Sequence, residues 1–342
     1  MKKEKRVTIK DVAGRASVSI ATVSHVINET RFVSDDLKGR ILAAIEETDY
    51  QLDMMAGSLR KQSTRTVGLI VPDISNPIYA ELSKLIENNL FADNFTLILC
   101  NSEHDPFREK KYLDMLRTKR VDGVIVIPAS ADIAHINALV AKGLPMVVLD
   151  RPVSGARADA VFIDHERAVF DATQYLVGLG HRRIGYLDKS HDVPHKAPRL
   201  DGFHAALKVH GIDFDDTLHV EAGVTFEDGA SAMGRLLQRG PRPTAVIAFD
   251  DVVAMGAMRA CRDRGLDIPD DISVVGFDDM PLCAYTVPRL TTVKYPRRKM
   301  AETACALLLE RIRSGMDGNR QEIVLPLEFI VRESTAFRGE AP

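Results

Sequence analysis

VSIATVSHVIN, at residues 18–28, decides what kind of domain the chain begins with. The stretch contains no Lys, Arg, Asp or Glu and is rich in β-branched residues, so a buried strand is the first interpretation to consider. Its apolar residues Val23, Val26 and Ile27 nevertheless recur at helical spacing, and Ser19 is a residue type that caps helices. We therefore predict a short helix whose other face is kept small and neutral, so that a partner can approach it closely.

Two further helices are predicted on either side of this one. Thr8 caps a helix over residues 9–16, and Asp11 stands at the position that completes a capping box. Ser34 opens a third helix, in which apolar residues repeat at helical spacing at Leu37, Ile41, Ala44 and Ile45. The pattern alone leaves two interpretations open, which are a plain three-helix bundle and a helix-turn-helix unit that binds DNA.

In a helix-turn-helix unit the second helix enters the major groove, where small side chains and hydroxyl groups permit close approach to the phosphates and base edges. The outward residues of the predicted second helix are Ile20, Ala21, Thr22, Ser24, His25 and Asn28. A basic arm precedes the unit, made of Lys2, Lys3, Lys5, Arg6 and Lys10 against Glu4. Residues 1–62 contain 11 Lys and Arg against 9 Asp and Glu, whereas the remainder contains 34 against 39, which indicates a polyanionic partner for the N-terminal part.

The composition favours a cytoplasmic globular protein of two or three domains. The chain has 342 residues, of which 45% are hydrophobic and 27% charged. The first ten residues lack the apolar core of a secretory signal, and no apolar run approaches the roughly 18–20 residues of a membrane span. The four cysteines lack metal-binding or redox spacing and are expected to be reduced, buried thiols: Cys100, Cys261, Cys283 and Cys305.

From about residue 66 onward, short apolar runs alternate with stretches of helical spacing, such as 78–91, 106–117 and 168–179. The runs lie at residues 66–72, 96–100, 123–128, 145–150, 160–164, 183–188, 244–250 and 272–279. Continuous apolar strands between amphipathic helices indicate parallel sheets covered on both faces. The number of units exceeds one modest sheet, so we predict an α/β fold with two doubly wound lobes and a ligand site at the carboxyl ends of the strands.

The headpiece sequence and several later motifs resemble the lactose/galactose repressor family, and the headpiece most closely resembles the purine-repressor branch. The motifs include TIKDVAGRASVSIATVSHVIN (8–28), VGLIVPDISNPIYAEL (67–82), PTAVIAFDDVVAMGAMRA (243–260) and ISVVGFDDMPL (272–282). The resemblance implies a ligand-responsive repressor that is dimeric and binds a pseudo-palindromic operator. The implied parts are a headpiece at 1–52, a hinge helix and linker at 53–65, a first lobe like that of periplasmic binding proteins at 66–164 plus 293–325, and a second at 165–292 plus 326–342.

The resemblance also implies which residues contact DNA. Base-reading positions correspond to Ile20, Ala21, Thr22 and His25, and backbone-contacting positions to Thr8, Ser19, Ser24 and Asn28. Arg31 matches a residue near the groove. Because Ile20 and Ala21 are apolar, they can meet thymine methyl groups but cannot form bidentate hydrogen bonds, so polar reading is expected from Thr22 and His25.

The segment DMMAGSLRKQST (53–64) is too short to form a stable isolated helix, and Gly57 weakens it further, so a flexible linker is one interpretation. The resemblance implies instead a hinge helix that forms on DNA. In that interpretation Leu59 wedges into the central minor-groove step, and Ala56 and Arg60 face the groove. A segment so close to unfolding is a switch that the ligand lobes can control.

For the effector cleft, the resemblance implies Tyr79, Asp150, His195, Arg199, Val224, Asp250 and Asp278. Carboxylate and guanidinium groups around an aromatic ring suit a polyhydroxy ligand, and the loop before Arg199 differs from that of purine-binding members. Val224 stands where many sugar-binding members have an aromatic residue. Asp251 and Asp279 are equally well interpreted as caps of the helices that follow. An acidic sugar is one hypothesis for the effector, because four basic residues could accommodate it together: Arg151, His195, Lys196 and Arg199.

The sequence also bears on two other classes of protein, enzymes and transport-type binding proteins. Enzyme motifs such as GxSxG, HExxH and the P-loop are absent from the sequence, no cofactor is expected, and Gly180 follows a predicted helix, which favours a helix C-cap over a dinucleotide loop. A transport-type sugar-binding protein would carry a signal peptide and no headpiece. The tail FIVRESTAFRGEAP contains no leucine heptads, so a dimer is expected without further coiled-coil assembly.

Overall fold

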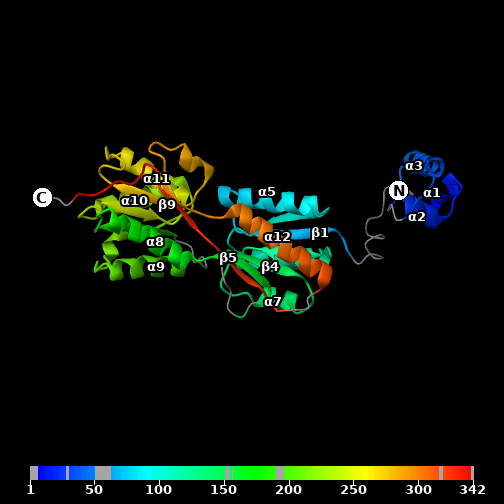
Figure 1. Cartoon of the computed structure of the whole chain (residues 1–342), viewed down its shortest axis with the longest axis horizontal. Coiled ribbons are helices and arrows are strands. Elements are labelled where there is room, and N and C mark those ends of the chain that lie inside the picture. The colour runs from blue at the N-terminus through cyan, green and yellow to red at the C-terminus, as the bar shows by residue number, and fades with distance from the viewer. Residues whose placement is uncertain are drawn as a thin grey trace, which may run out of the picture. The chain divides into compact units, whose positions relative to one another are not determined.

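The computed structural model describes residues 7–27, 31–50, 63–150, 155, 157–189, 196–315 and 319–339. The chain forms two compact units, residues 1–64 and 65–342, which are considered separately below (Figure 1).

The described residues of the first unit form three helices, α1 (Ile9–Ala16), α2 (Ile20–Ile27) and α3 (Asp35–Thr48), which confirms the prediction of a helical headpiece and excludes a strand at residues 20–27. Thr8 donates from its main-chain nitrogen to the Asp11 carboxylate across 2.8 Å, as in the expected capping box. The core consists of residues from all three helices: Val12, Ala13, Ala16, Val23, Val26, Ile41 and Ala44. Arg40 on α3 donates to the Ala16 carbonyl at the end of α1 across 2.7 Å and so braces the turn before α2.

The second unit begins with a six-stranded sheet in the order β11-β5-β4-β3-β1-β2, in which every pair is parallel. Its strands are β1 (Thr66–Val71), β2 (Thr96–Asn101), β3 (Gly123–Val126), β4 (Met146–Asp150), β5 (Asp159–Ile163) and β11 (Glu322–Leu325). Alternate strand residues pack in two cores, under α5 (Pro77–Ala92) and α12 (Arg297–Ser314) on one face and under α6 (Pro106–Thr118) and α7 (Ala134–Val140) on the other.

A second six-stranded sheet has the order β12-β10-β9-β8-β6-β7. Its strands are β6 (Ile184–Lys189), β7 (His219–Ala222), β8 (Ala245–Ala248), β9 (Ser273–Asp278), β10 (Thr291–Lys294) and β12 (Glu328–Ile330). Figure 1 shows α8 (His165–Gly178) and α9 (Lys196–Val209) on one face of this sheet, and α10 (Phe226–Gln238) and α11 (Asp251–Arg262) on the other. The two doubly wound sheets confirm the predicted fold class.

Three segments connect the two lobes, after β5, after β10 and after β11. All four residues of β10 pair with β9 in the second sheet, so the return to the first lobe, expected from residue 293, begins after Lys294. β12 is antiparallel to β10, because β10 leaves the second lobe and β12 re-enters it. This pair departs from the all-parallel expectation.

The eight apolar runs all form strands, but the expected series omits β7, β10, β11 and β12. These four strands have three or four residues each and lie at or next to a sheet edge, so none of them contains a long apolar run. The predicted helix C-cap is confirmed, because Gly180 follows α8 with φ +89° and a Cβ atom there would lie 2.4 Å from the Arg338 carbonyl oxygen. Within the described residues, no helix is long and apolar enough to span a membrane.

Candidate functional site: the headpiece and the interlobe cavity

The face of α2 that the headpiece core leaves uncovered begins with Ile20 and Ala21, which are exposed, Ile20 at 43%. The Ser19 hydroxyl oxygen accepts a hydrogen bond from the main-chain nitrogen of Thr22 across 3.1 Å and lies 2.8 Å from the Thr22 hydroxyl. These contacts cap α2 as predicted and hold Thr22 in its first turn, next to the two exposed apolar residues.

The remaining residues that are expected to contact DNA differ in their exposure to solvent. Ser24 and His25 are half-buried on α2, and Thr8 and Arg31 are exposed. The Thr8 hydroxyl donates to the Asp11 carboxylate across 2.6 Å, so this hydroxyl must exchange a partner before it can donate to a phosphate. Four expected contact residues lie outside the described residues: Asn28, Ala56, Leu59 and Arg60.

In the second unit, a cavity lies at the carboxyl ends of strands from both lobes. It is lined by Asn76, Ile78, Tyr79, Leu82, Asp150, Lys189, Arg199, Phe249, Asp250, Asp278 and Tyr295. Asp150, Lys189 and Asp278 are the last residues of β4, β6 and β9, and Asn76 and Asp250 cap α5 and α11. This is the location at which doubly wound sheets bind ligands. The cavity measures only about 20 Å³, so its side chains are packed nearly against one another.

Arg199 is held by both polar and aromatic contacts at this cavity. Its Nε donates to Nδ1 of His165 across 3.1 Å, and its Nη1 donates to the main-chain oxygen of Phe249. The guanidinium carbon lies 3.6 Å from the ring centroid of Phe277 and 4.4 Å from that of Phe249. Charged planar groups between aromatic rings are favoured by cation–π attraction, so the guanidinium is stabilised although it is only 3% exposed.

The His165 ring continues this chain of contacts into the first lobe. Since Nδ1 accepts from Arg199, the ring proton is on Nε2, which donates to the main-chain oxygen of Asp150 across 2.8 Å and lies 3.3 Å from the Asp150 carboxylate. The Tyr295 hydroxyl also forms a hydrogen bond with the Asp150 carboxylate. The two lobes are therefore connected through polar groups at the cavity.

The acidic groups of the cavity lie in an environment that disfavours negative charge. Burial, and after it the nearby Asp251 carboxylate, raises the pKa of Asp278 well above its usual range. Burial and the Asp150 carboxylate likewise raise the pKa of Tyr79 and that of Tyr295. Asp150 and Asp278 also have positive φ values, 77° and 114°, which cost about 1–3 kcal/mol each in a non-glycine residue. Such strain at two strand ends is typical of a functional site.

Comparison with known proteins assigns both units. Residues 8–53 match the family described as bacterial regulatory proteins, lacI family, and residues 173–335 match a periplasmic binding protein-like domain. The chain is 35% identical over 330 residues to the HTH-type transcriptional repressor PurR of Photobacterium profundum, which covers 96% of this chain and 98% of that protein.

The chain belongs to the lacI family of bacterial regulatory proteins.

Other members of the family extend the comparison. The HTH-type transcriptional regulator DegA of Bacillus subtilis is 35% identical over 340 residues, covering 97% of this chain and 98% of the relative. A solved lac repressor dimer bound to operator and an anti-inducer has a TM-score of 0.85 and 26% identity, covering 97% of this chain and all of that one. A lacI-family regulator from Enterococcus faecium with bound ribose has a TM-score of 0.73 and 33% identity, covering 80% of this chain and all of that one. These relatives are regulators, so the chain is a transcriptional regulator and not an enzyme.

For this lacI-family chain, the structure brings together five of the seven expected effector residues: Tyr79, Asp150, Arg199, Asp250 and Asp278. Val224 does not line the cavity. It lies after the edge strand β7, where its main-chain nitrogen donates to the Asp228 carboxylate across 3.0 Å. His195 and Arg151 lie outside the described residues. Lys196 forms an ion pair with Glu221 across 2.6 Å and is not part of the cavity.

The capping interpretation of the acidic residues needs correction. Asp250 caps α11, because its carboxylate accepts from the Val253 nitrogen across 2.9 Å. Asp251 is the first helical residue, fully buried, and accepts from the Thr292 hydroxyl across 2.6 Å and the Met280 nitrogen across 2.8 Å. Asp279 forms an ion pair with Arg332 across 2.5 Å. Both therefore hold neighbouring segments in place instead of capping a helix.

Lys189, Phe249 and Tyr295 are cavity residues that the sequence interpretation missed. The strand predicted to end at residue 188 continues by one residue, and the alternation of side chains along it then directs Lys189 into the cavity. Among the described residues, no group of three or more His, Cys, Asp or Glu is arranged to hold a metal ion.

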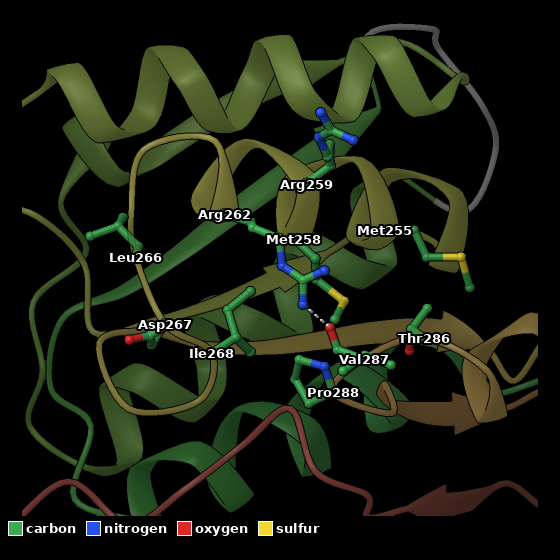
Figure 2. Close-up of a pocket in the computed structure, with 10 residues that line it drawn as sticks. All are labelled: Met255, Met258, Arg259, Arg262, Leu266, Asp267, Ile268, Thr286, Val287 and Pro288. Carbon is green, nitrogen blue, oxygen red and sulfur yellow. Dashed lines mark hydrogen bonds between the residues drawn. The ribbon is translucent and has the colours of Figure 1, made fainter.

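A larger cavity of about 230 Å³ lies elsewhere on the second lobe, between α11 and the loop 286–288 (Figure 2). Figure 2 shows Met255, Met258 and Arg262 on the helix side, with the Arg262 guanidinium donating to the Val287 carbonyl oxygen across 2.5 Å. This cavity is away from the strand ends and lacks the convergent carboxylates of the interlobe site. The charged and aromatic groups suited to ligand binding therefore converge at the smaller interlobe cavity and not at this one.

Proposed function

We propose that this protein is a repressor that binds a pseudo-palindromic operator as a homodimer and changes its DNA affinity when a sugar or related metabolite occupies the interlobe cavity. The observation that carries this proposal is the combination, in one chain, of a capped helix with an exposed face at Ile20 and Ala21 and a cavity in which carboxylates surround Arg199. Base reading is assigned to Ile20, Ala21, Thr22 and His25. Such a regulator works where the chromosome is, which in a bacterium is the cytoplasm.

The class of effector is inferred from the chemistry of the cavity. The Arg199 guanidinium donates hydrogen bonds, the carboxyl groups of Asp150, Asp250 and Asp278 accept them, and Tyr79 and Phe249 provide aromatic surface. This mixture suits hydroxyl groups on a compact ring. The solved relatives with bound ribose and with cellobiose support a sugar or sugar derivative.

The small volume of the cavity suggests how binding is transmitted. Ligand sites for small metabolites measure about 300–1,000 Å³, far more than the interlobe cavity, so the lobes must separate for an effector to enter. Movement of the first lobe then changes the geometry at residue 65, where the second unit begins. In this scheme the segment 53–65 is a hinge helix whose order on DNA depends on the lobes, and residues 1–52 are the headpiece. The lobes comprise 66–164 with the segment after Lys294 up to residue 325, and 165–294 with 326–342.

Dimerisation is proposed to use the loop beside the larger cavity. Leu282, Tyr285 and Val287 are 48%, 82% and 74% exposed, and Val287 lines the larger cavity together with Met255 on α11. These exposed apolar side chains suit a surface that contacts a second copy of the chain. The dimeric state of the solved lac repressor supports this occupant. Two headpieces are required because a pseudo-palindrome presents two half-sites.

Selection of bound fragments from the genomic DNA of the source organism tests the proposed function. The wild-type chain is expected to enrich a pseudo-palindrome, and a Thr22→Ala/His25→Ala variant is expected to lose preference at defined positions, about 1–3 kcal/mol for each lost contact. Leu42→Ala, on the exposed side of α3, is the matched control. Enrichment of unrelated fragments by the wild-type chain would overturn the proposal.

A further inference from the structure

Lys189 is a buried cation at the interlobe cavity, and it is not among the residues that the sequence resemblance implies for effector binding. It ends β6 and is 3% exposed, and it lines the interlobe cavity. The preceding residue, Asp188, faces the opposite side of the sheet, where its carboxylate lies 3.1 Å from Nε2 of His219 and 3.8 Å from Nζ of Lys196. The nearest acidic residue in the sequence is therefore not the partner of Lys189.

The charged groups that act on Lys189 come from both lobes, at the ends of β4 and β9, on α9 and at the cap of α11: Asp150, Arg199, Asp250 and Asp278. Within the described part of the chain, no carboxylate forms an ion pair with the Lys189 ammonium group. Instead, Nζ lies 5.3 Å from the centroid of the Phe249 ring, and the Arg199 guanidinium lies 4.4 Å from the same centroid. Two cations thus share one aromatic ring, and each disfavours the charge of the other.

The carboxylates of the cavity are already engaged in other contacts. Asp250 accepts from the Val253 nitrogen as the cap of α11, and Asp150 interacts with His165 and Tyr295. Burial and the neighbouring carboxylates raise the pKa of Asp278, which favours its neutral form. Burial also lowers the pKa of Lys189, while Asp250 raises it. A buried ammonium group without a close counter-ion is unfavourable. An anionic group that arrives with the ligand would therefore pair with Lys189 and stabilise its charged form strongly.

We propose that the effector of this protein carries an anionic group, a carboxylate or a phosphate, that pairs with Lys189, while Arg199 and the cavity aspartates hold its hydroxyl groups. This inference rests on the proposed function, because it assumes that the interlobe cavity binds the effector. The sequence-based hypothesis placed an acidic sugar among Arg151, His195, Lys196 and Arg199. The present inference gives the pairing with the anionic group to Lys189 instead of Lys196, because Lys196 pairs with Glu221 and does not line the cavity.

The test is a calorimetric titration of the full chain with matched pairs of neutral and anionic compounds. The carboxylate pairs are D-glucose with D-glucuronate and D-galactose with D-galacturonate, and the phosphate pairs are D-glucose with D-glucose 6-phosphate and D-ribose with D-ribose 5-phosphate. At least one anionic member is expected to bind ten times more tightly than its neutral counterpart. The type of pair that shows this preference distinguishes a carboxylate from a phosphate.

The variant Lys189→Met is expected to lose the preference for that anionic compound by tenfold or more, whereas Lys189→Arg keeps its direction. Lys196→Met removes the same charge seven positions later, outside the cavity, and is expected to leave the preference unchanged. If Lys189→Met does not fold, as judged by circular dichroism, Lys189→Gln provides the same test with a polar side chain of similar length.

Tighter binding of only the neutral members, binding of none of the compounds, or an unchanged preference in the Lys189 variants would overturn the inference. The proposed function fails by a different result, which is the absence of an enriched operator in the genomic selection. A chain that selects an operator and binds a neutral sugar with no preference for its acid would therefore retain the proposed function and lose only the role of Lys189.

Discussion

Nε of Arg199 on α9 donates a hydrogen bond to Nδ1 of His165 at the start of α8, across 3.1 Å. This contact fixes the tautomer of the histidine and lets its other nitrogen donate to Asp150 in the first lobe. One guanidinium group therefore organises the second lobe and, through one imidazole ring, the contact between the lobes.

Replacement of Arg199 by Met is expected to lower the free energy of unfolding by about 1–3 kcal/mol, because the Phe249 carbonyl oxygen and His165 Nδ1 lose their buried donor. Chemical denaturation of the ligand-free chain measures this change. Arg182→Met, at an exposed position, is the control and is expected to change stability by less than about 0.5 kcal/mol. A stabilised Arg199→Met variant would show that the buried guanidinium is unfavourable without a ligand.

The buried carboxyl group of Asp251 is expected to make stability depend on pH. Burial raises its pKa from 3.8 to about 7, so between these values the folded chain binds more protons than the unfolded chain. The contribution of Asp251 to the free energy of unfolding therefore falls as pH rises through this window, with a slope of at most about 1.4 kcal/mol per pH unit.

Thermal unfolding of the wild-type chain and an Asp251→Asn variant from pH 5 to pH 8 isolates this contribution as the difference between the two curves. The variant is expected to be less stable at pH 5, because the Thr292 and Met280 hydrogen bonds are altered, and to lose less stability as pH rises. Asp201→Asn, on the exposed side of α9, serves as the control. Parallel curves for the wild-type and Asp251→Asn chains would contradict the prediction.

Val287→Glu tests the dimer surface. A carboxylate among the exposed apolar side chains of the proposed interface is expected to weaken dimerisation by about 2 kcal/mol or more, which analytical ultracentrifugation detects as dissociation at micromolar concentration. Val209→Glu introduces the same charge at a residue that is 67% exposed at the end of α9 and is expected to leave the dimer intact. A Val287→Glu chain that dimerises like the wild type would place the interface elsewhere.

Leu59→Ala tests the hinge, which lies outside the described residues and is predicted from the sequence resemblance alone. Loss of the wedge is expected to reduce affinity for the selected operator by about 2 kcal/mol, with little effect on binding to unrelated DNA. Fluorescence anisotropy at fixed salt measures both affinities, and Leu42→Ala is the matched control. Unchanged specific affinity would leave the flexible-linker interpretation in place.

Much of the fold was predictable because local signals agreed with one another. Thr8 and Ser19 mark helix starts in the headpiece, and long Val- and Ile-rich runs mark the buried strands. The short edge strands escaped prediction because their pairing depends on residues distant in the sequence: β11 pairs with β5, and β12 with β10. The local sequence of these short strands does not indicate which distant strand each one pairs with.

The cavity was predictable only where the family resemblance applied. It indicated Asp150, Arg199 and Asp278, and the structure brings them together, while their role in binding remains a proposal. Lys189 comes directly after the expected strand, so its direction into the cavity depends on the exact length of β6. Tyr295 lies where the chain crosses between lobes after Lys294, so its position depends on that crossing. Val224 does not line the cavity, because it follows β7, which is at the edge of its sheet.

The three segments that connect the lobes have a mechanical consequence. A joint made of one segment would allow the lobes to twist and slide in several directions, whereas three segments side by side favour bending about a single axis. Every effector that enters the cavity must then act through the same opening movement, and compounds of different shape would differ in how far they drive that movement and not in its direction. Occupancy of the cavity would thus change a single quantity, the angle between the two lobes, and different effectors would set it to different values.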